Sequence, residues 1–310
     1  MLNRRHLRIK VLQELYAFYQ SGNDDLAVAE KNLFRNLDKI YELYIFMLLF
    51  FSELCEFEKT FIEERVQKKY YAKQAEKPAD VFSRLRFCGL LTNDRKFASE
   101  VKRLKLSWQA EHQWIQNIYV RLSKSTEFEK AAAVKTDELA FLTWFIEKMI
   151  ATQEDFRSMI EEKNIHWDEE FDFICHMLEK TIKDSLNAGA IKLSRLFRDE
   201  KDDKEFVRDL FLKTILHSEE YQKMIAERTQ HWEVDRIAMM DNLLMKMALA
   251  EISHFPTIPV KVSINEYIDI SKDYSTPKSR EFINGIIDKL AIGMRNEGKI
   301  IKTGRGLIEQ

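Results

Sequence analysis

The sequence predicts an all-α protein. Only 8 Gly and 4 Pro, the residues that break helices, occur among 310 residues. Leu, Glu, Lys, Ala and Ile recur at helical spacing, and the apolar residues are numerous enough for a sizeable core. The formal net charge of −2 does not indicate a basic or acidic partner, so charge is informative only locally.

The first predicted helix runs from Arg4 to about Tyr19, and a very long helix follows from about Leu26 to Tyr70. Pro78 and the segment around Gly89 predict breaks, and SWQAEHQWIQNIYVRL and ELAFLTWFIEKMIA predict further helices. The charged segment from Phe197, FRDEKDDKE, predicts a solvated connector. Beyond it the spacing predicts five helices and a loose Gly- and Lys-rich tail, the helices lying near 206–217, 219–230, 235–254, 263–272 and 278–295.

The segment SINE predicts a capping box, in which the Ser263 side chain accepts from the Glu266 backbone and Glu266 reaches back. Pro277 suits the first position of the last helix. Gly285 lies inside that helix at a cost of about 1 kcal/mol relative to Ala. A close approach by another helix, or by a ligand, would account for it.

One internal repeat is visible. Phe141–Trp167 aligns without a gap to Phe206–Trp232, with His and Trp at the end of both copies. Each copy predicts a helix pair closed by a Trp that packs across the turn. A duplicated hairpin indicates a scaffold, and chance similarity between amphipathic helices is the alternative.

No pattern typical of an enzyme is present. The sequence has no Gly-rich phosphate loop and no metal-ligand spacing among its histidines, so we expect no catalysis, no metal and no cofactor. Cys55, Cys88 and Cys175 are scattered, as in a cytoplasmic protein with reduced thiols. The N-terminus lacks a signal peptide, and the most apolar run, Tyr44–Leu54, is too short to span a membrane.

Basic residues crowd the start of the first helix, where the helix dipole disfavours them. Arg4, Arg5 and Arg8 fall on the apolar, core-facing arc of that helix, and His6 lies opposite. Beside free backbone N–H groups they would suit a phosphate-bearing strand, with Tyr16 as a stacking surface for a base. A frayed basic N-terminus without a ligand is the alternative.

Two stretches resemble the NusB family of bacterial transcription antitermination factors. RRHLRIKVLQELYAF resembles its Arg-rich N-terminal helix, and LLMKMALAEISHFPTIPVKVSINEYIDISKDYSTPKSREFINGIIDKL resembles its C-terminal signature. The resemblance covers about the first twenty residues and roughly 206–295. It implies an all-α, NusB-like pair of helical bundles that binds single-stranded boxA RNA together with NusE, a small-subunit ribosomal protein, in an RNA polymerase antitermination complex.

The resemblance also implies site residues. Arg4, Arg5 and Arg8 match arginines of the family's RNA-contacting motif, and His6 stands where another Arg is common. The rest of the implied RNA surface is Lys278, Ser279, Arg280 and Phe282, although position 278 is often acidic in relatives. Asp235, Arg236 and Asp241 fall where family members face NusE.

Most of the middle of the chain has no counterpart in ordinary NusB proteins. We therefore expect four parts: the N-terminal part of the core at 1–44, a large helical insertion at 45–200 that includes the first repeat copy, the C-terminal part of the core at 201–296, and a flexible tail at 297–310. A helical protein–protein scaffold that has lost RNA binding is the second hypothesis.

Overall fold

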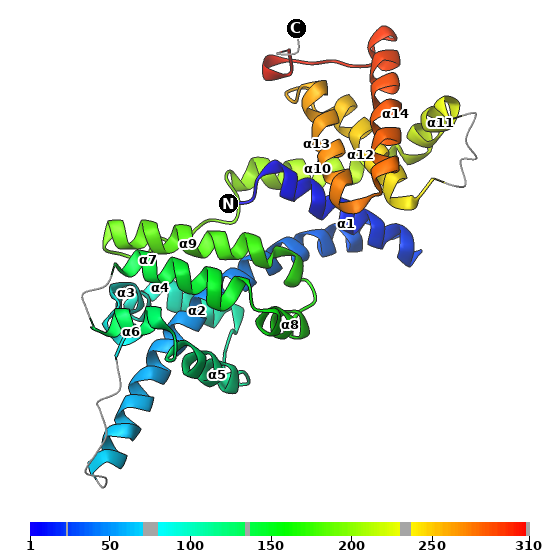
Figure 1. Ribbon diagram of the computed structural model, residues 1–310. Helices are drawn as coiled ribbons and strands as arrows, with labels where there is room; N and C mark the ends of the chain where they lie inside the picture. The colour runs from blue at the N-terminus through cyan, green and yellow to red at the C-terminus, as the bar shows by residue number, and fades with distance from the viewer. Residues whose placement is uncertain (23, 71–79, 134–136, 230–236, 308–310) are drawn as a thin grey trace. The chain divides into compact units, whose positions relative to one another are not determined.

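The computed structural model describes residues 1–22, 24–70, 80–133, 137–229 and 237–307. Over these residues it contains fourteen α-helices and no strand, which confirms the all-α prediction (Figure 1). The chain forms two compact units. Unit 1 consists of Leu37–Leu196 together with Met1, and unit 2 consists of Leu2–Asn36 and Phe197–Gln310.

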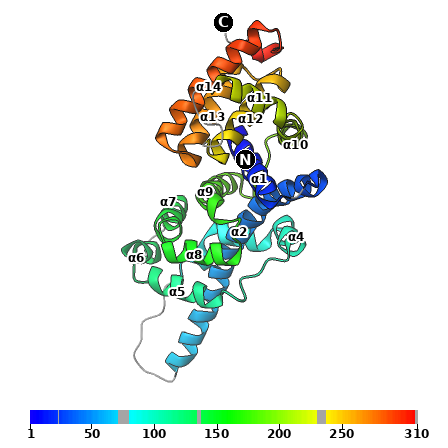
Figure 2. The same ribbon diagram turned by 90° about the vertical axis from the view of Figure 1, so that its right-hand side faces the viewer.

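α2 (Leu26–Tyr70) continues from unit 2 into unit 1 without a break. The other α-helices of unit 1 are α3 (Arg86–Asn93), α4 (Arg95–Leu104), α5 (His112–Leu122), α6 (Thr126–Ala133), α7 (Glu138–Phe145), α8 (Glu154–Lys163) and α9 (Phe171–Ala188). Two 3₁₀ turns, Phe82–Arg84 and Asp168–Glu170, and one π-helix, Ile146–Ala151, complete the described elements of unit 1. Figure 2 shows the shorter helices of this unit grouped around α2.

An aromatic core holds unit 1 together. Phe46 of α2 stacks on Trp108, with ring centroids 4.3 Å apart, and the Trp108 indole N–H donates to the Phe46 carbonyl at 2.9 Å. Trp167, which closes the first repeat copy, is buried and its ring lies 5.2 Å from that of Phe46. Aromatic pairs of this kind add to the free energy gained by burial alone. Trp232, the matching residue of the second copy, lies outside the described residues.

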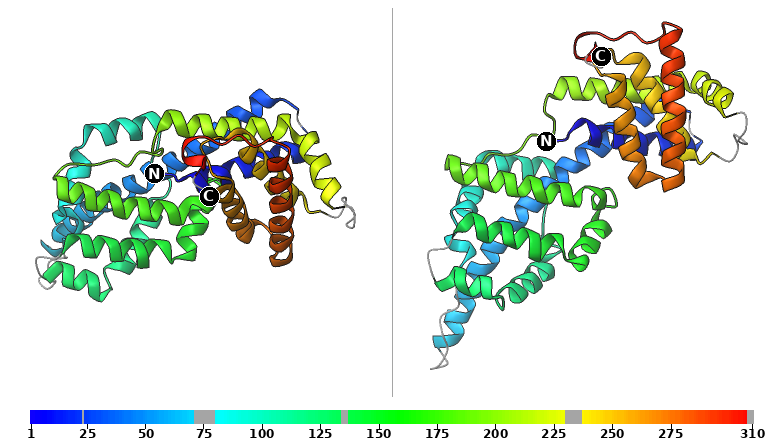
Figure 3. Two further views of the ribbon diagram at one scale, coloured as in Figure 1. Left: turned by 90° about the horizontal axis from the view of Figure 1, so that it is seen from above. Right: turned by 45° about the horizontal axis from the view of Figure 1, so that its top comes forward.

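Unit 2 is built around α12 (Met239–His254), which packs most extensively against four other helices. These neighbours are α1 (Arg4–Ser21), α10 (Glu200–Leu216), α13 (Val260–Tyr274) and α14 (Pro277–Asn296). α11 (Ser218–Arg228) lies against α14 and α12. Both views of Figure 3 show α13 and α14 side by side at the C-terminal end of this unit.

Two expected interruptions are helical instead. α10 begins at Glu200, so the charged segment after Phe197 is not wholly a connector. Asp199 caps this helix by accepting from the Asp202 backbone N–H. Acidic residues in the first turn interact favourably with the positive end of the helix dipole. Gly89 itself lies inside α3, and the break predicted in CGLLTND comes at the last residue of that segment, Asp94, which caps α4.

The capping-box prediction is wrong. α13 begins at Val260 after Pro259, so Ser263 is already inside the helix. Its backbone N–H donates to the Pro259 carbonyl, and its hydroxyl donates to Glu251. The last helix begins as predicted, with Thr276 as the cap and Pro277 in the first turn.

Two glycines differ in their surroundings. A Cβ at Gly285 would meet nothing within 4 Å, so no helix in the described part of the chain approaches it. A Cβ at Gly306 would lie 2.1 Å from the Pro256 carbonyl oxygen. The segment after α14 packs against the connection between α12 and α13, which contains Phe255 and Pro256. The Thr303 N–H donates to the Pro256 carbonyl at 2.9 Å, and Lys302 Nζ donates to the Phe255 carbonyl at 3.0 Å.

Candidate nucleic-acid interface

The predicted phosphate-binding arginines occupy the first two turns of α1. Asn3 caps this helix, and its side-chain oxygen accepts from the His6 backbone N–H at 2.9 Å. The His6 Nδ1 atom lies 2.9 Å from the same oxygen. We use the name arginine cluster for Arg4, Arg5 and Arg8 with their carboxylate partners, Asp202, Asp203, Glu251, Glu266 and Asp269.

Arg8 is the buried member of the arginine cluster, with 3% of its side chain exposed. Its Nε and Nη2 atoms donate to the two carboxylate oxygens of Glu251, each at 2.7 Å. Ser263 and Tyr267 of α13 donate to the same carboxylate at 2.7 and 3.0 Å. Burial lowers the pKa of Arg8, but the hydrogen bonds and charge of Glu251 outweigh burial and raise it above its ordinary value. Glu251 therefore joins α1, α12 and α13 through one fully bonded carboxylate.

Arg5 is half-exposed and pairs with two carboxylates of α13. Its guanidinium donates to Glu266 at 3.0 and 3.1 Å and to Asp269 at 2.7 Å. The hydrogen bond from Lys272, then the charge of Arg5, lowers the pKa of Asp269, while the hydrogen bond to Glu266 raises the pKa of Arg5. Arg5 and Asp269 therefore remain charged over the neutral pH range.

Arg4 lies over an aromatic ring and keeps one unfilled donor. Its guanidinium carbon is 4.2 Å from the centre of the Phe206 ring, a cation–π arrangement. It pairs with Asp202 and, at 3.4 Å, with Asp203 at the start of α10. Its Nη1 atom is buried and has no hydrogen-bond partner among the described residues. The Asp202 side chain is 71% exposed, so this partner is free to move away.

The free energies of these pairs decide which arginines can take a new partner. Exposed ion pairs contribute about 0–1 kcal/mol, because water and salt screen them. Removing one partner of a buried pair costs about 3–5 kcal/mol, because it leaves an uncompensated charge. Arg4 and Arg5 can therefore exchange a carboxylate for another anion at small cost. Arg8 is held in place and fixes the helix on which the other two stand.

The remaining residues of the predicted RNA surface lie toward the other end of α1. Gln13 Nε2 donates to the Tyr274 hydroxyl at 3.0 Å, which brings the end of α13 and the start of α14 beside the middle of α1. Tyr16, one turn further along α1, is 38% exposed. Eight residues separate Arg5 from Gln13, a distance of about 12 Å along a helix axis.

At the start of α14 the predicted residues differ in exposure. Lys278 is exposed, and Ser279, Arg280 and Phe282 are half-buried. The Ser279 N–H donates to the Thr276 hydroxyl at 3.2 Å. The structure thus places the predicted residues at two points of unit 2, the arginine cluster and the start of α14.

The predicted partner-binding residues are described only in part. Asp241, in the first turn of α12, is 4% exposed and accepts a hydrogen bond from the Ser275 hydroxyl before α14. Asp235 and Arg236 lie outside the described residues. The contact with a partner stays a prediction for all three.

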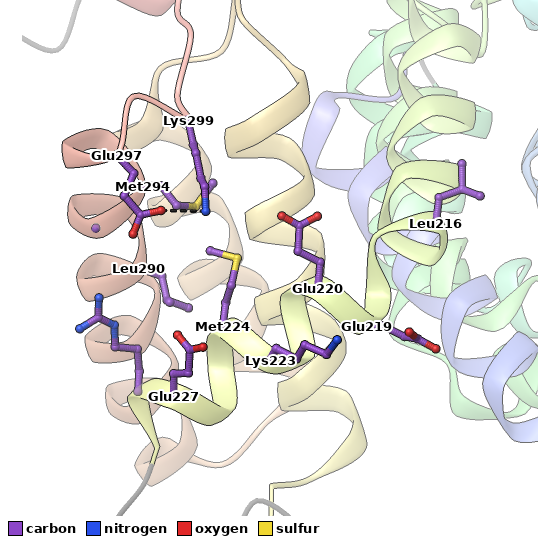
Figure 4. A pocket seen from close by; sticks show the side chains of 12 residues that line it. Leu216, Glu219, Glu220, Lys223, Met224, Glu227, Leu290, Met294, Glu297 and Lys299 are labelled. Atoms are coloured by element: carbon purple, nitrogen blue, oxygen red, sulfur yellow. Dashed lines mark ion pairs between the residues drawn. The ribbon is translucent and has the colours of Figure 1, made fainter.

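Unit 2 also has a groove of about 490 Å³ between α11 and α14 (Figure 4). Met224, Leu290 and Met294 line it, and an ion pair of 2.7 Å between Glu297 and Lys299 lies at its rim. Both carboxylates and cations line it, so the groove does not carry charge of a single sign. None of its lining residues belongs to the arginine cluster.

The described ranges contain neither a metal cluster nor a membrane span. No group of three or more His, Cys, Asp or Glu side chains there is placed to hold a metal ion. No helix among these residues is both long enough and apolar enough to cross a membrane.

Comparison with known proteins assigns the C-terminal part of the chain. Residues 171–291 match the model of the NusB family. This part of the chain is therefore similar to the NusB family. No solved structure matches the chain.

Curated NusB proteins support this assignment. The transcription antitermination protein NusB of Salinibacter ruber is 42% identical over 105 residues, 34% of this chain and 66% of that protein. Those of Chloroherpeton thalassium and Desulforamulus reducens are 39% and 41% identical over 106 and 86 residues. These two matches span 34% and 28% of this chain and 50% and 60% of the relatives. The chain thus covers between half and two thirds of the length of these NusB relatives.

The NusB family match divides the arginine cluster. All five carboxylates and Phe206 lie within the match, whereas Arg4, Arg5 and Arg8 precede it. It begins at Phe171, at the start of α9 and inside the segment 45–200 expected to be an insertion.

Sequence reasoning missed the carboxylates that surround the arginines. One signal was present: Glu251 is the only charged residue in MALAEI, and a buried carboxylate needs a cation to offset its charge. Arginines on the core-facing arc of α1 supply that cation. Asp202 and Asp203 gave no such signal, because a run of acidic residues also suits a solvated helix start.

Proposed function

We propose that the chain is a non-catalytic transcription antitermination factor of the cytoplasm that binds single-stranded boxA-type RNA. NusE and an RNA polymerase antitermination complex are its proposed partners. The observation that carries this proposal is the state of Arg4. Its guanidinium rests on Phe206, one donor is unfilled, and its main partner is an exposed carboxylate that a phosphate can replace.

In this proposal the RNA backbone takes the place of Asp202 on Arg4 and of Asp269 on Arg5. Both guanidinium groups then bind phosphate, for which their planar donors are well suited. Arg8 stays on Glu251 and holds α1 in position, so a direct RNA contact by Arg8 needs a rearrangement.

The strand continues along α1 toward Tyr16, which offers a ring for base stacking. His6, between Arg5 and Arg8 in the first turns of α1, is a further proposed contact. At the start of α14 the proposed contacts are Lys278, Ser279, Arg280 and Phe282. Asp235, Arg236 and Asp241 remain the proposed contacts for NusE.

One observation favours a second function. All three arginines are already paired with carboxylates of the same unit, as in a protein that no longer binds RNA. In that case the chain is a helical protein–protein scaffold, and neither the arginines nor added RNA affects its partner binding.

Fluorescence anisotropy with a labelled boxA-type RNA, with and without NusE, separates the two functions. We expect R4A/R5A to weaken binding at least tenfold and to make the slope of log K against log salt shallower by about 0.7 for each phosphate that the variant no longer neutralises. R208A/R228A is the matched control, because it removes the same charge from two exposed arginines of unit 2 outside the proposed RNA surface, of which Arg208 pairs with Glu30 at 2.6 Å. Binding that is equal in wild type, R4A/R5A and the control contradicts the RNA-binding site. No RNA binding by the wild type, with NusE present, supports the scaffold.

A further inference from the structure

α4 of unit 1 has a strongly basic outer face. Phe97 is buried and Val101 and Leu104 are half-buried, so the apolar side of the helix faces the unit. Arg95, Lys96, Lys102 and Arg103 project from the opposite arc, and Lys105 follows at the end of the helix. Figure 2 shows where α4 lies in unit 1.

The cations of α4 differ from those of α1 in their partners. Arg103 pairs with Glu100 at 2.6 Å. Arg95, Lys96, Lys102 and Lys105 have no ion pair or hydrogen bond from their side chains to any residue that the structure describes. In the arginine cluster, by contrast, every arginine is paired. The charge of α4 is therefore available to a ligand outside the chain.

The end of α4 places a lysine where glycine is usual. Lys105 is the C-cap residue and has φ 55° and ψ 40°, in the left-handed region. Among the described residues it is the one residue other than Gly with positive φ. Gly22 and Gly189 occupy the corresponding positions after α1 and α9. A lysine in this conformation sacrifices stability and adds a fifth cation at the exposed end of the helix.

We propose that Arg95, Lys96, Lys102 and Lys105, the α4 basic surface, bind the backbone phosphates of RNA that flanks the boxA-type element. This inference rests on the proposed function. These four cations can neutralise phosphates, which are the same in every RNA sequence, so we expect them to bind the RNA backbone independently of its bases. A membrane-surface helix would turn its apolar side to the lipid, but Phe97 faces the inside of the unit.

The test compares two RNAs, the boxA-type element alone and the element with single-stranded flanks, in R95Q/K96Q/K102Q. The matched control is K59Q/K130Q/K180Q, which removes the same charge from exposed lysines of unit 1 that pair with Glu56, Glu127 and Asp184. We expect the α4 variant to bind the flanked RNA about five- to tenfold more weakly, with a salt slope shallower by about 0.7 for each phosphate left without its cation. The short RNA should bind equally well to the α4 variant and to the control.

Lys105→Gly provides a second readout. We expect this variant to melt at a higher temperature, because Gly adopts the left-handed region without strain, and to bind the flanked RNA more weakly. A flanked-RNA affinity that is the same in the α4 variant and the control overturns the inference and leaves the proposed function intact. Failure of the wild type to bind either RNA overturns the proposed function first. Loss of binding to phosphatidylserine vesicles in the α4 variant, with RNA binding unchanged, assigns the surface to membranes and also overturns the inference.

Discussion

The guanidinium of Arg8 and the carboxylate of Glu251 form two parallel hydrogen bonds of 2.7 Å in the interior of unit 2. Arg8→Ala leaves the Glu251 charge buried without its cation. We expect the free energy of unfolding to fall by about 3–5 kcal/mol, measured by urea denaturation. The exposed-pair variant Arg208→Ala should cost less than about 1 kcal/mol.

A double variant separates the effect of the unpaired charge from the effect of the lost side-chain volume. Arg8→Met with Glu251→Met removes both charges and keeps most of the volume, so we expect it to be more stable than Arg8→Ala. A double variant as unstable as the single one contradicts this account of the buried pair.

Asp202 competes with RNA for Arg4 under the proposed function. Asp202→Asn removes the competing charge, and we expect RNA affinity to rise about two- to fivefold, the free energy of one exposed ion pair. Glu205→Gln is the matched control, since Glu205 is an exposed carboxylate one turn along α10 that does not pair with Arg4. If RNA affinity rises equally in both variants, the cause is the lower negative charge of the protein, and competition between Asp202 and RNA for Arg4 is rejected.

Gly285 is exposed inside α14 with open space where a Cβ would lie. Gly285→Ala should raise the free energy of unfolding by about 0.5–1 kcal/mol, because alanine favours the helix and meets no neighbour. Gly89→Ala in α3 meets equally open space and should be stabilising too. If the bare backbone at Gly285 is a ligand contact, RNA affinity falls only in Gly285→Ala. A destabilised Gly285→Ala protein contradicts the expectation.

The lowered pKa of His254 predicts that the free energy of unfolding falls in mild acid. Burial, and then the charges of His217 and Lys213, lower its pKa in the folded protein below the ordinary 6.5. The unfolded chain therefore binds the proton more tightly, and the contribution present above pH 6.5 is lost as the pH falls toward the folded-state pKa. Urea midpoints should drop between about pH 7.5 and about pH 5.5, and His254→Gln should reduce that drop. An unchanged drop in the variant assigns the acid sensitivity to other groups.

Helical periodicity was sufficient to predict most of the fold. The long helix from Leu26 to Tyr70 and the start of the last helix at Pro277 are as predicted, because they depend on local spacing and local breakers. The capping box failed because Ser263 and Glu266 found better partners in α12 and α1, and no local pattern reveals such contacts.

The same limit applies to the candidate site. Arg8 on the apolar arc was visible in the sequence, but its partner is 243 positions away. The pairing of Arg5 with Asp269 likewise depends on how α1 packs against α13. Sequence reasoning therefore located the cations and missed the anions that balance them.

The passage of α2 from one unit into the other bears on how the protein can be dissected. Unit 2 is assembled from both ends of the chain, so a fragment that starts at Phe197 retains Glu251, Ser263 and Tyr267 but loses α1. That fragment would expose the apolar surface that Leu7 and Leu12 cover. It would also leave the buried Glu251 carboxylate without Arg8, the cation that pairs with it. The matched segment 171–291 also lacks α1, so we expect it to need the distant N-terminal residues to complete its interior.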